Sequence, residues 1–305
     1  MNKVKNTKKI IMQLNSLKVL EEIIACPFDK SNLEYHEEFF ECIFCHKKFL
    51  IQNNLIDFSI KEKINLDDKG SNSICYQEYY DTLIGKSSTK EKFLSFGTVS
   101  NDISAGFVNE TTKHLLKYSD PSKIVCDIGA GTGDYSLSMA KMSKFLFHCD
   151  LDINGIKIAQ KKAKLQNIDN IYFLRCDYFK LPFKDHALDL TYAIDVVERG
   201  KDHDSKLIHQ LSRITHIDGL VIFDCHLTER LKFTRVKEDV LYTYSKFFLL
   251  EYSQKFNLKI LKIIGTGYVP QLRKWKQFEY IFLNFLCKLV SIPPARWLMI
   301  HKISN

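Results

Sequence analysis

Short apolar runs alternate with amphipathic stretches along the chain from about residue 111 onward. Between two of the runs, Leu207, Ile208, Leu211 and Ile214 fall on one face of a helix, and residues 244–256 repeat this spacing. Strands that alternate with helices are typical of a parallel α/β sheet, whose ligands bind at the carboxyl ends of the strands. We therefore predict a seven-stranded, doubly wound, Rossmann-like sheet with strands at residues 123–126, 145–149, 171–175, 188–194, 220–225, 258–264 and 297–302.

The composition is that of a globular protein, with 305 residues of which 45% are hydrophobic and 26% are charged. It excludes a disordered chain, a collagen-like repeat and a disulfide scaffold. The nine cysteines are an odd number and lie mostly inside apolar runs, so we expect a reduced, cytoplasmic setting. We find neither a signal-peptide pattern nor an uninterrupted apolar stretch of about 18 residues, and therefore expect a soluble protein.

The net charge of +8 is concentrated at one end of the chain. Residues 1–119 are balanced and residues 120–226 nearly so, whereas residues 227–305 hold 14 basic and 5 acidic side chains. Aromatic residues are interleaved with this charge, which fits a solvated helical face, an anionic substrate, a membrane surface or RNA. The basic residues concerned are Arg230, Lys232, Arg235, Lys237, Arg273, Lys274 and Lys276.

A glycine-rich turn follows the first predicted strand, in the segment Asp127-Ile-Gly129-Ala130-Gly131-Thr-Gly133-Asp134. The glycines permit a tight turn and a close approach to a ligand. We expect a helix to begin near Asp134, whose carboxylate would cap its free N–H groups. A dinucleotide fingerprint would place its third glycine at residue 134, so Asp134 disfavours NAD and FAD, and no Gly-Lys-Ser/Thr follows as a Walker loop requires.

Three predicted strands end in an aspartate: Asp127, Asp150 and Asp177. Because the carboxyl ends of parallel strands meet at one rim, we expect these carboxylates to converge there. A carboxylate on the first strand suits an ammonium group, one on the second suits ribose hydroxyls, and one on the third suits an exocyclic amine. The helix-cap and ordinary-turn interpretation competes for each residue alone but does not explain the ordered set.

The ordered set resembles the class I S-adenosylmethionine-dependent methyltransferases over roughly residues 75–305. Their Asp/Glu-x-Gly-x-Gly-x-Gly motif matches 127–133, their Leu-Pro-Phe landmark matches 181–183, and Asp-Val-Val-Glu at 195–198 matches their Asp-Val-Leu-Glu. Arg199 departs from their usual His, and 217–219 departs from their Pro-Gly-Gly turn. The resemblance implies S-adenosylmethionine as cofactor, bound by Asp127, Gly129, Ala130, Gly131, Gly133, Asp150, Leu151, Asp177, Tyr178 and Asp195.

A cysteine pattern near the N-terminus indicates a degenerate zinc ribbon. The segments Cys26-Pro-Phe-Asp29 and Cys42-Ile-Phe-Cys45 have the spacing of two zinc knuckles, with Asp29 in place of a cysteine. This segment resembles the zinc-ribbon domain of tRNA-methyltransferase activator proteins, also in its tail at residues 49–56. Asp29 could be the fourth ligand of a structural zinc, His46 could replace it, or the ribbon could fold without metal.

The organisation that follows has four parts. We expect a lead segment at residues 1–20, the ribbon-like β domain at 21–60, a linker with cap helices at 61–110, and the methyltransferase domain at 111–305. The basic, aromatic part at about 227–295 would be a cap insert. For an oxygen nucleophile a base is needed, and the candidates at strand ends are Glu198, His203 and His226.

The function we expect is methyl transfer from S-adenosylmethionine to a small or lipid-like metabolite. An RNA base methyltransferase is the alternative enzyme, and a non-catalytic activator or scaffold with the methyltransferase fold is a second alternative. Peripheral membrane contact through the basic C-terminal region is a further expectation. The oligomeric state is not predicted by the sequence.

Overall fold

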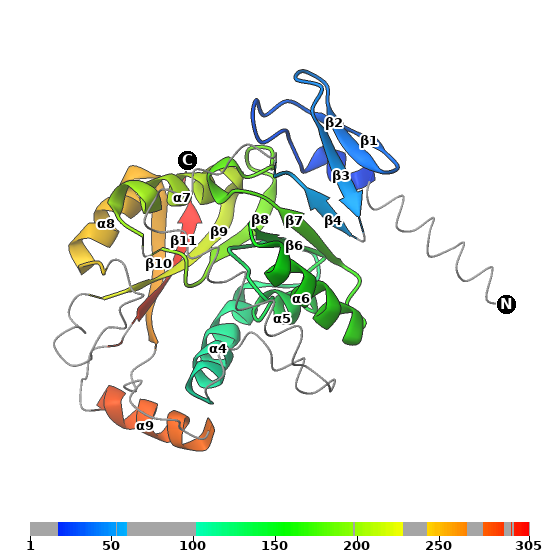
Figure 1. The fold of residues 1–305 in the computed structure, drawn as a ribbon. Coiled ribbons are helices and arrows are strands. Elements are labelled where there is room, and N and C mark those ends of the chain that lie inside the picture. The colour runs from blue at the N-terminus through cyan, green and yellow to red at the C-terminus, as the bar shows by residue number, and fades with distance from the viewer. Residues whose placement is uncertain are drawn as a thin grey trace.

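The computed structural model describes residues 18–52, 54–59, 102–197, 199–227, 243–266, 277–289, 294 and 296–304. One continuous 11-stranded sheet runs through the described residues (Figure 1). Its strands lie in the order β1 (Leu33–His36), β2 (Phe39–Cys42), β3 (Lys48–Gln52), β4 (Leu55–Asp57), β7 (Ile171–Arg175), β6 (Phe145–Asp150), β5 (Ile124–Ile128), β8 (Leu188–Ala193), β9 (Thr215–His226), β11 (Arg296–Ile303) and β10 (Leu258–Thr266).

Helices cover both faces of the sheet. Alternate side chains of each central strand point to opposite faces, so Leu146 lies in one hydrophobic cluster and Phe147 in the other. One cluster receives α4 (Asp102–Leu115), α5 (Ser136–Ala140) and α6 (Ile153–Leu165), and the other receives α7 (Lys201–Ile214) and α8 (Lys246–Lys255). The remaining described helices are α9 (Gln277–Leu289) and the short η1 (Leu20–Glu22), η2 (Leu116–Tyr118) and η3 (Tyr178–Lys180).

Each of the seven segments predicted as a strand overlaps one, and the predicted α/β class is confirmed. Strands β4 to β9 pair in parallel around β5, whereas β11 runs antiparallel between β9 and β10. The largest difference from prediction is β9, which begins at Thr215 rather than at residue 220. Its first residues include the exposed, polar His216 and Asp218, so hydropathy alone does not reveal them.

The strands at residues 33–57 lie in the segment predicted as the ribbon and extend the central sheet, and the division into a ribbon domain and a second domain stays a prediction. Strand β4 pairs in parallel with β7, and Phe58 N donates to Arg175 O over 2.9 Å. Ribbon residues such as Phe40 and Phe49 share one buried cluster with Leu174 and Phe183. The seven expected strands therefore form one part of a longer sheet, and the ribbon buries its apolar side chains against the rest of the molecule.

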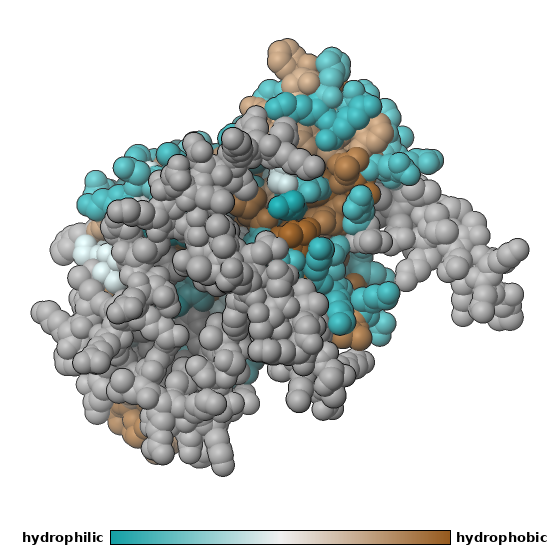
Figure 2. Space-filling model, in the orientation of Figure 1, coloured by the Kyte–Doolittle hydropathy of each residue, from teal (hydrophilic) through white to brown (hydrophobic). Residues whose placement is uncertain are grey.

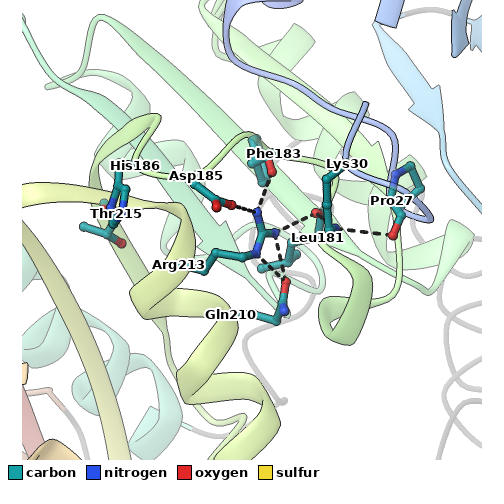
Figure 3. Close-up of polar contacts among 9 residues, drawn as sticks. All are labelled: Pro27, Lys30, Leu181, Phe183, Asp185, His186, Gln210, Arg213 and Thr215. Carbon is teal, nitrogen blue, oxygen red and sulfur yellow. Dashed lines mark hydrogen bonds and ion pairs between the residues drawn. The ribbon is translucent and has the colours of Figure 1, made fainter. Parts of the chain in front are cut away.

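A second line of contacts joins the ribbon to the segment before β8 (Figure 3). Lys30 Nζ donates to Leu181 O over 3.0 Å, and Arg213 from α7 donates to the same oxygen over 3.1 Å. Arg213 also binds Phe183 O and the Asp185 carboxylate, at 2.8 and 2.7 Å. Burial and the nearby Arg213 guanidinium lower the pKa of Lys30 to about 8. The ribbon is thus tied to α7 through the shared Leu181 carbonyl.

Several predictions fall on residues that lie outside the described ranges. These include the lead segment up to residue 17, the linker at 60–101, Glu198, and every basic residue named above in the cap insert. In the part of the chain that the structure does describe, no helix has the length and apolar character needed to cross a membrane.

Candidate functional site

The glycine turn folds back onto the neighbouring strand β6. The amides of Gly129 and Ala130 both donate to Cys149 O, at 2.9 and 3.1 Å. Gly129 has a φ of +71°, and a Cβ there would lie 2.6 Å from Cγ2 of Val196. A larger residue would therefore clash with the loop that follows β8. The turn needs glycine here to lie flat against the carboxyl ends of β5, β6 and β8.

Asp150 lies at the end of β6 and bonds directly to this turn. Gly131 N donates to Asp150 Oδ2 over 2.7 Å, and Asp152 N donates to Oδ1 over 2.8 Å. Burial raises the pKa of the Asp150 carboxyl, while the amides act in the opposite direction. Each oxygen keeps a further lone pair, so the carboxylate can accept hydrogen bonds from a diol while it stays bound to the two amides.

Asp127 lies beneath the turn rather than on its open side. Its side chain is only 2% exposed and accepts a hydrogen bond of 2.5 Å from Ser136 Oγ, which also contacts His148 Nδ1 at 2.9 Å. Burial raises the pKa of Asp127 to about 7 and lowers the pKa of His148 to about 3. This geometry gives Asp127 a supporting position, and its direct contact with an ammonium group stays a prediction.

The expected helix cap at Asp134 is wrong. Helix α5 begins at Ser136, after Tyr135, and no side chain caps it. Asp134 instead forms an ion pair with Lys162 of α6, whose Nζ lies 3.0 Å from Oδ1 and whose side chain is 1% exposed. A buried ammonium group requires a partner, and Asp134 is the carboxylate within reach. The carboxylate that we predicted as a helix cap is therefore the partner of a buried lysine.

A polar chain leads from the end of β7 into α7. Asp177 caps η3, because its carboxylate accepts a hydrogen bond of 2.8 Å from Phe179 N. The hydroxyl oxygen of the next residue, Tyr178, lies 2.7 Å from His203 Nε2. His203 Nδ1 is 3.0 Å from Oδ1 of Asp204, which is 1% exposed. Burial raises the pKa of Tyr178 to about 12, so the phenol is the donor to Nε2 and the imidazole donates from Nδ1.

The buried Asp204 carboxylate holds His203 in place through several donors. It also accepts from Arg199 N, at 3.1 and 3.3 Å to its two oxygens, and from the hydroxyl of Tyr244. His203, one of the two predicted bases that the structure describes, is held by a buried carboxylate. His226, at the end of β9, is largely buried, and this burial lowers its pKa to about 4. His226 is therefore neutral at physiological pH and a weak base.

The end of β8 carries a charge cluster that the sequence did not indicate. Asp195 has a φ of +64°, and its amide donates to Asp224 Oδ1 over 2.7 Å. Arg296, at the start of β11, pairs with Asp195 and with Asp224, the latter at 2.8 Å. Burial lowers the pKa of Arg296 to about 10, so it remains charged. Arg296 was missed because it lies about a hundred residues away in sequence and arrives on the antiparallel strand.

The Tyr135 hydroxyl and Gly155 are two further features that prediction missed. Tyr135 follows the glycine turn, and its hydroxyl is buried with no hydrogen-bond partner among the described residues. A Cβ on Gly155 in α6 would lie 3.0 Å from Gly131 O, so this glycine lets α6 pack against the turn. The pairing of Gly155 with the turn has no local signature, since the two are separated by strand β6.

The ribbon brings Cys26, Asp29, Cys42 and Cys45 together, with one potential ligand atom of each within 4.8 Å of the others. Cys26 Sγ lies 3.7 Å from Cys45 Sγ, and Cys42 Sγ lies 3.5 Å from both Asp29 oxygens. His46 is outside the cluster, because its side chain is 75% exposed and lies 3.8 Å from Glu41. The predicted alternative of His46 as a ligand has no support in this geometry.

The two segments of the cluster share one backbone conformation. Lys30 N donates to Cys26 O over 2.9 Å, and His46 N donates to Cys42 O over 3.0 Å. The residues after Asp29 and Cys45, Lys30 and His46, both have a positive φ, of 64° and 56°. Asp29 therefore occupies the position that the second cysteine holds in the intact knuckle, and three thiols with one carboxylate are a donor set that suits zinc.

Residues 126–223 match a family model described as a methyltransferase domain. This part of the chain is therefore similar to a methyltransferase domain. The sheet order around β5 and the glycine turn agree with this match. The predicted enzyme class, an S-adenosylmethionine-dependent methyltransferase, is confirmed at the level of this domain.

Similar proteins differ widely in length and in overall sequence. Norajmaline N-methyltransferase from Rauvolfia serpentina is 30% identical over 122 residues, covering 38% of this chain and 41% of that protein. The structure of magnesium protoporphyrin IX methyltransferase from Synechocystis with bound SAH has a TM-score of 0.53 at 16% identity, over 76% of this chain and all of that one. The chain spans 25 to 41% of the length of the first curated relatives that it matches.

One further structure is relevant to the ribbon. A complex between the Haloferax volcanii Trm112 methyltransferase activator and a methyltransferase contains a chain with a TM-score of 0.53 and 15% identity, matched over 66% of this chain and 91% of that chain. The likeness at this identity concerns the fold. In the present chain the ribbon contacts the rest of the sheet through the parallel pairing of β4 with β7.

Proposed function

We propose that this protein transfers a methyl group from S-adenosylmethionine to a small or lipid-like acceptor. The observation that supports the proposal is the rim, where Asp150 at the end of β6 binds the glycine turn and the neighbouring strand β7 leads into Asp177. The names of the norajmaline and magnesium protoporphyrin IX enzymes describe small acceptors, which supports the same acceptor class for this chain.

The residues at the rim fit S-adenosylmethionine. Asp150 accepts the ribose hydroxyls, and Asp177 with the backbone of Tyr178 contacts the adenine, so the Tyr178 hydroxyl stays with His203. The turn at Gly129, Ala130, Gly131 and Gly133 lets the amino-acid part approach the backbone, and Asp195 borders it. The unpartnered Tyr135 hydroxyl gives this region a donor that no described residue uses. Leu151, whose carbonyl accepts from Arg175 Nε at 3.2 Å, lies beside the ribose.

When bound, the cofactor supplies an electrophilic sulfonium methyl group, and the chain has to position the acceptor and remove its proton. We assign the proton-accepting role to His203, acting through the Tyr178 hydroxyl that is hydrogen bonded to its Nε2. Buried Asp204 stabilises the imidazolium that forms. A bound cofactor would supply the methyl carbon to the acceptor's lone pair and keep the electron pair of the broken carbon–sulfur bond, and this relay would take the acceptor's proton.

The cysteine cluster fits a structural zinc held by Cys26, Cys42, Cys45 and Asp29. Four ligands close a tetrahedral site, so no position remains for a catalytic water. The amides of Phe44 and Cys45 each lie 3.4 Å from Cys42 Sγ, which would stabilise a thiolate at this position. The metal would fix the ribbon against the sheet, in a role separate from the chemistry.

Calorimetric titration with S-adenosylmethionine tests the cofactor site. Asp150→Ala removes the proposed acceptor of the ribose hydroxyls, so we expect the affinity to fall at least about tenfold. Asp169→Ala is the matched control, since Asp169 is exposed and lies before the amino end of β7. Absence of binding to the wild-type chain would contradict the proposal.

The acceptor class can be identified with a radiolabelled methyl group and a host-cell extract. We expect the label in the organic-extractable fraction, and expect His203→Ala to reduce it while leaving the cofactor affinity unchanged. Label in the RNA or protein fraction would exclude a small acceptor. Equal labelling by His203→Ala would remove this residue from the mechanism.

A further inference from the structure

Helix α9 presents a row of large apolar side chains to solvent. Four of them, Ile281, Phe282, Phe285 and Leu289, are exposed by 54%, 53%, 62% and 69%. At about 100° per residue they occupy an arc of roughly 100° on one side of the helix. Figure 2 shows hydrophobic side chains at the lower left, where Figure 1 places α9. We define these four residues as the outer face of α9.

The opposite side of α9 is anchored to the rest of the protein. Leu283, Leu286 and Cys287 are partly buried, and the helix packs against α4. Lys288, seven residues after Ile281 and therefore at the edge of the outer face, also reaches α4, where its Nζ lies 3.3 Å from Glu110 Oε1. The helix is therefore apolar on both sides, and only its inner side is used by the fold. The outer face has the form of a contact surface.

The charge that precedes this helix in the sequence indicates what the outer face contacts. Arg273, Lys274 and Lys276 precede the helix by one to four residues in the sequence, and residues 227–305 hold 14 basic against 5 acidic side chains. A helix with exposed Phe, Ile and Leu beside clustered Lys and Arg is typical of segments that lie in the interface of an anionic membrane. A protein partner would need an apolar groove that matches the outer face, and the basic residues before the helix do not indicate such a partner.

We propose that the outer face of α9 docks this protein onto the surface of an anionic lipid bilayer. The apolar side chains enter the boundary between headgroups and acyl chains, while the net positive charge of residues 227–305 favours a surface of anionic lipids. The helix is too short to span a bilayer and lies along its surface. This docking goes beyond the proposed methyl transfer and does not depend on it.

Co-sedimentation with vesicles tests the proposal, without cofactor, on the full chain. The probes are phosphatidylcholine vesicles with and without phosphatidylglycerol. We expect binding to the anionic vesicles at low salt and a decline as salt is raised. Phe282→Glu/Phe285→Glu should lower the bound fraction at least about tenfold, because two charges would enter the interface. The melting temperature of each variant reports whether the fold is kept.

Leu50→Glu is the matched control, since Leu50 is 54% exposed on β3 of the ribbon, far from α9 in the fold (Figure 1). It should bind vesicles as the wild type does. Failure of the wild type to sediment with anionic vesicles at low salt would overturn the proposal, as would equal binding by the double variant. A wild-type dimer that Phe282→Glu/Phe285→Glu dissociates, without vesicle binding, would show that this face joins two copies and would also overturn it.

Discussion

The rim at the carboxyl ends of β5 to β8 and the cysteine cluster of the ribbon both hold their polar groups with backbone amides. Asp150 accepts from Gly131 N and Asp152 N, and Cys42 Sγ accepts from Phe44 N and Cys45 N. In the ribbon, four potential ligand atoms converge within 4.8 Å. At the rim, each carboxylate belongs to a different strand and is anchored separately. Convergence suits a single ion, and separation suits an extended ligand such as a nucleoside.

The comparison predicts that changes in the ribbon alter stability and that changes at the rim alter ligand binding. The ribbon shares its hydrophobic cluster with β6 and β7, so its loss would expose the core of the methyltransferase domain. The rim lies at the surface of that core, so we expect its side chains to contribute little to the free energy of unfolding. Four experiments can test this distinction.

The largest effect is expected from loss of the cluster. Cys42→Ser should remove about one zinc per chain and unfold the ribbon, because binding of a structural zinc contributes on the order of 10 kcal/mol to folding. Elemental analysis and thermal melting measure the two effects. Cys287→Ser, a free cysteine on α9, should change neither.

The fourth ligand can be identified in the same way. Asp29→Asn should weaken zinc retention against a chelator, whereas His46→Ala should leave it unchanged. A purified wild-type chain without zinc would contradict the proposed metal site. Hydrophobic burial alone would then hold the ribbon against the sheet.

An intermediate effect is expected at the ion pair under the glycine turn. Asp134→Asn leaves Lys162 buried without its partner, and breaking such a pair costs about 3 kcal/mol of unfolding free energy. Asp134→Asn/Lys162→Met removes both charges and should regain most of this loss. Urea unfolding measures both variants. Equal stability of Asp134→Asn and the wild type would show that water reaches Lys162.

An effect of similar size is expected from the titration of Asp127. Burial raises the pKa of this carboxyl to about 7, above its ordinary value of 3.8, so the folded state favours the protonated form. Its contribution to stability is complete below about pH 4 and is lost as pH rises toward 7. Stability curves of Asp127→Asn should therefore be flatter than those of the wild type across this range. Parallel curves would contradict a neutral Asp127.

Much of the rim was predictable because its residues follow strands directly. The glycine turn and the aspartates at 127, 150 and 177 each lie at the end of an apolar run, and parallel strands bring their carboxyl ends together. Arg296 could not be found in this way, since only the antiparallel pairing of β11 with β9 brings it to Asp224. The partner of Asp134 was missed as well. Lys162 lies on an amphipathic helix, and its sequence does not distinguish it from an exposed lysine.

The sequence alone determined the alternation of strands and helices, the glycine turn, the spacing of the two knuckles and the basic end of the chain. These features depend on local hydropathy, backbone freedom and covalent spacing. Only the tertiary structure decided that the ribbon continues the sheet through β4 and β7, that Asp127 is buried beneath the turn, and that Asp29 rather than His46 joins the three cysteines. Those outcomes depend on which segments pack together, because burial and partners fix the role of a polar side chain.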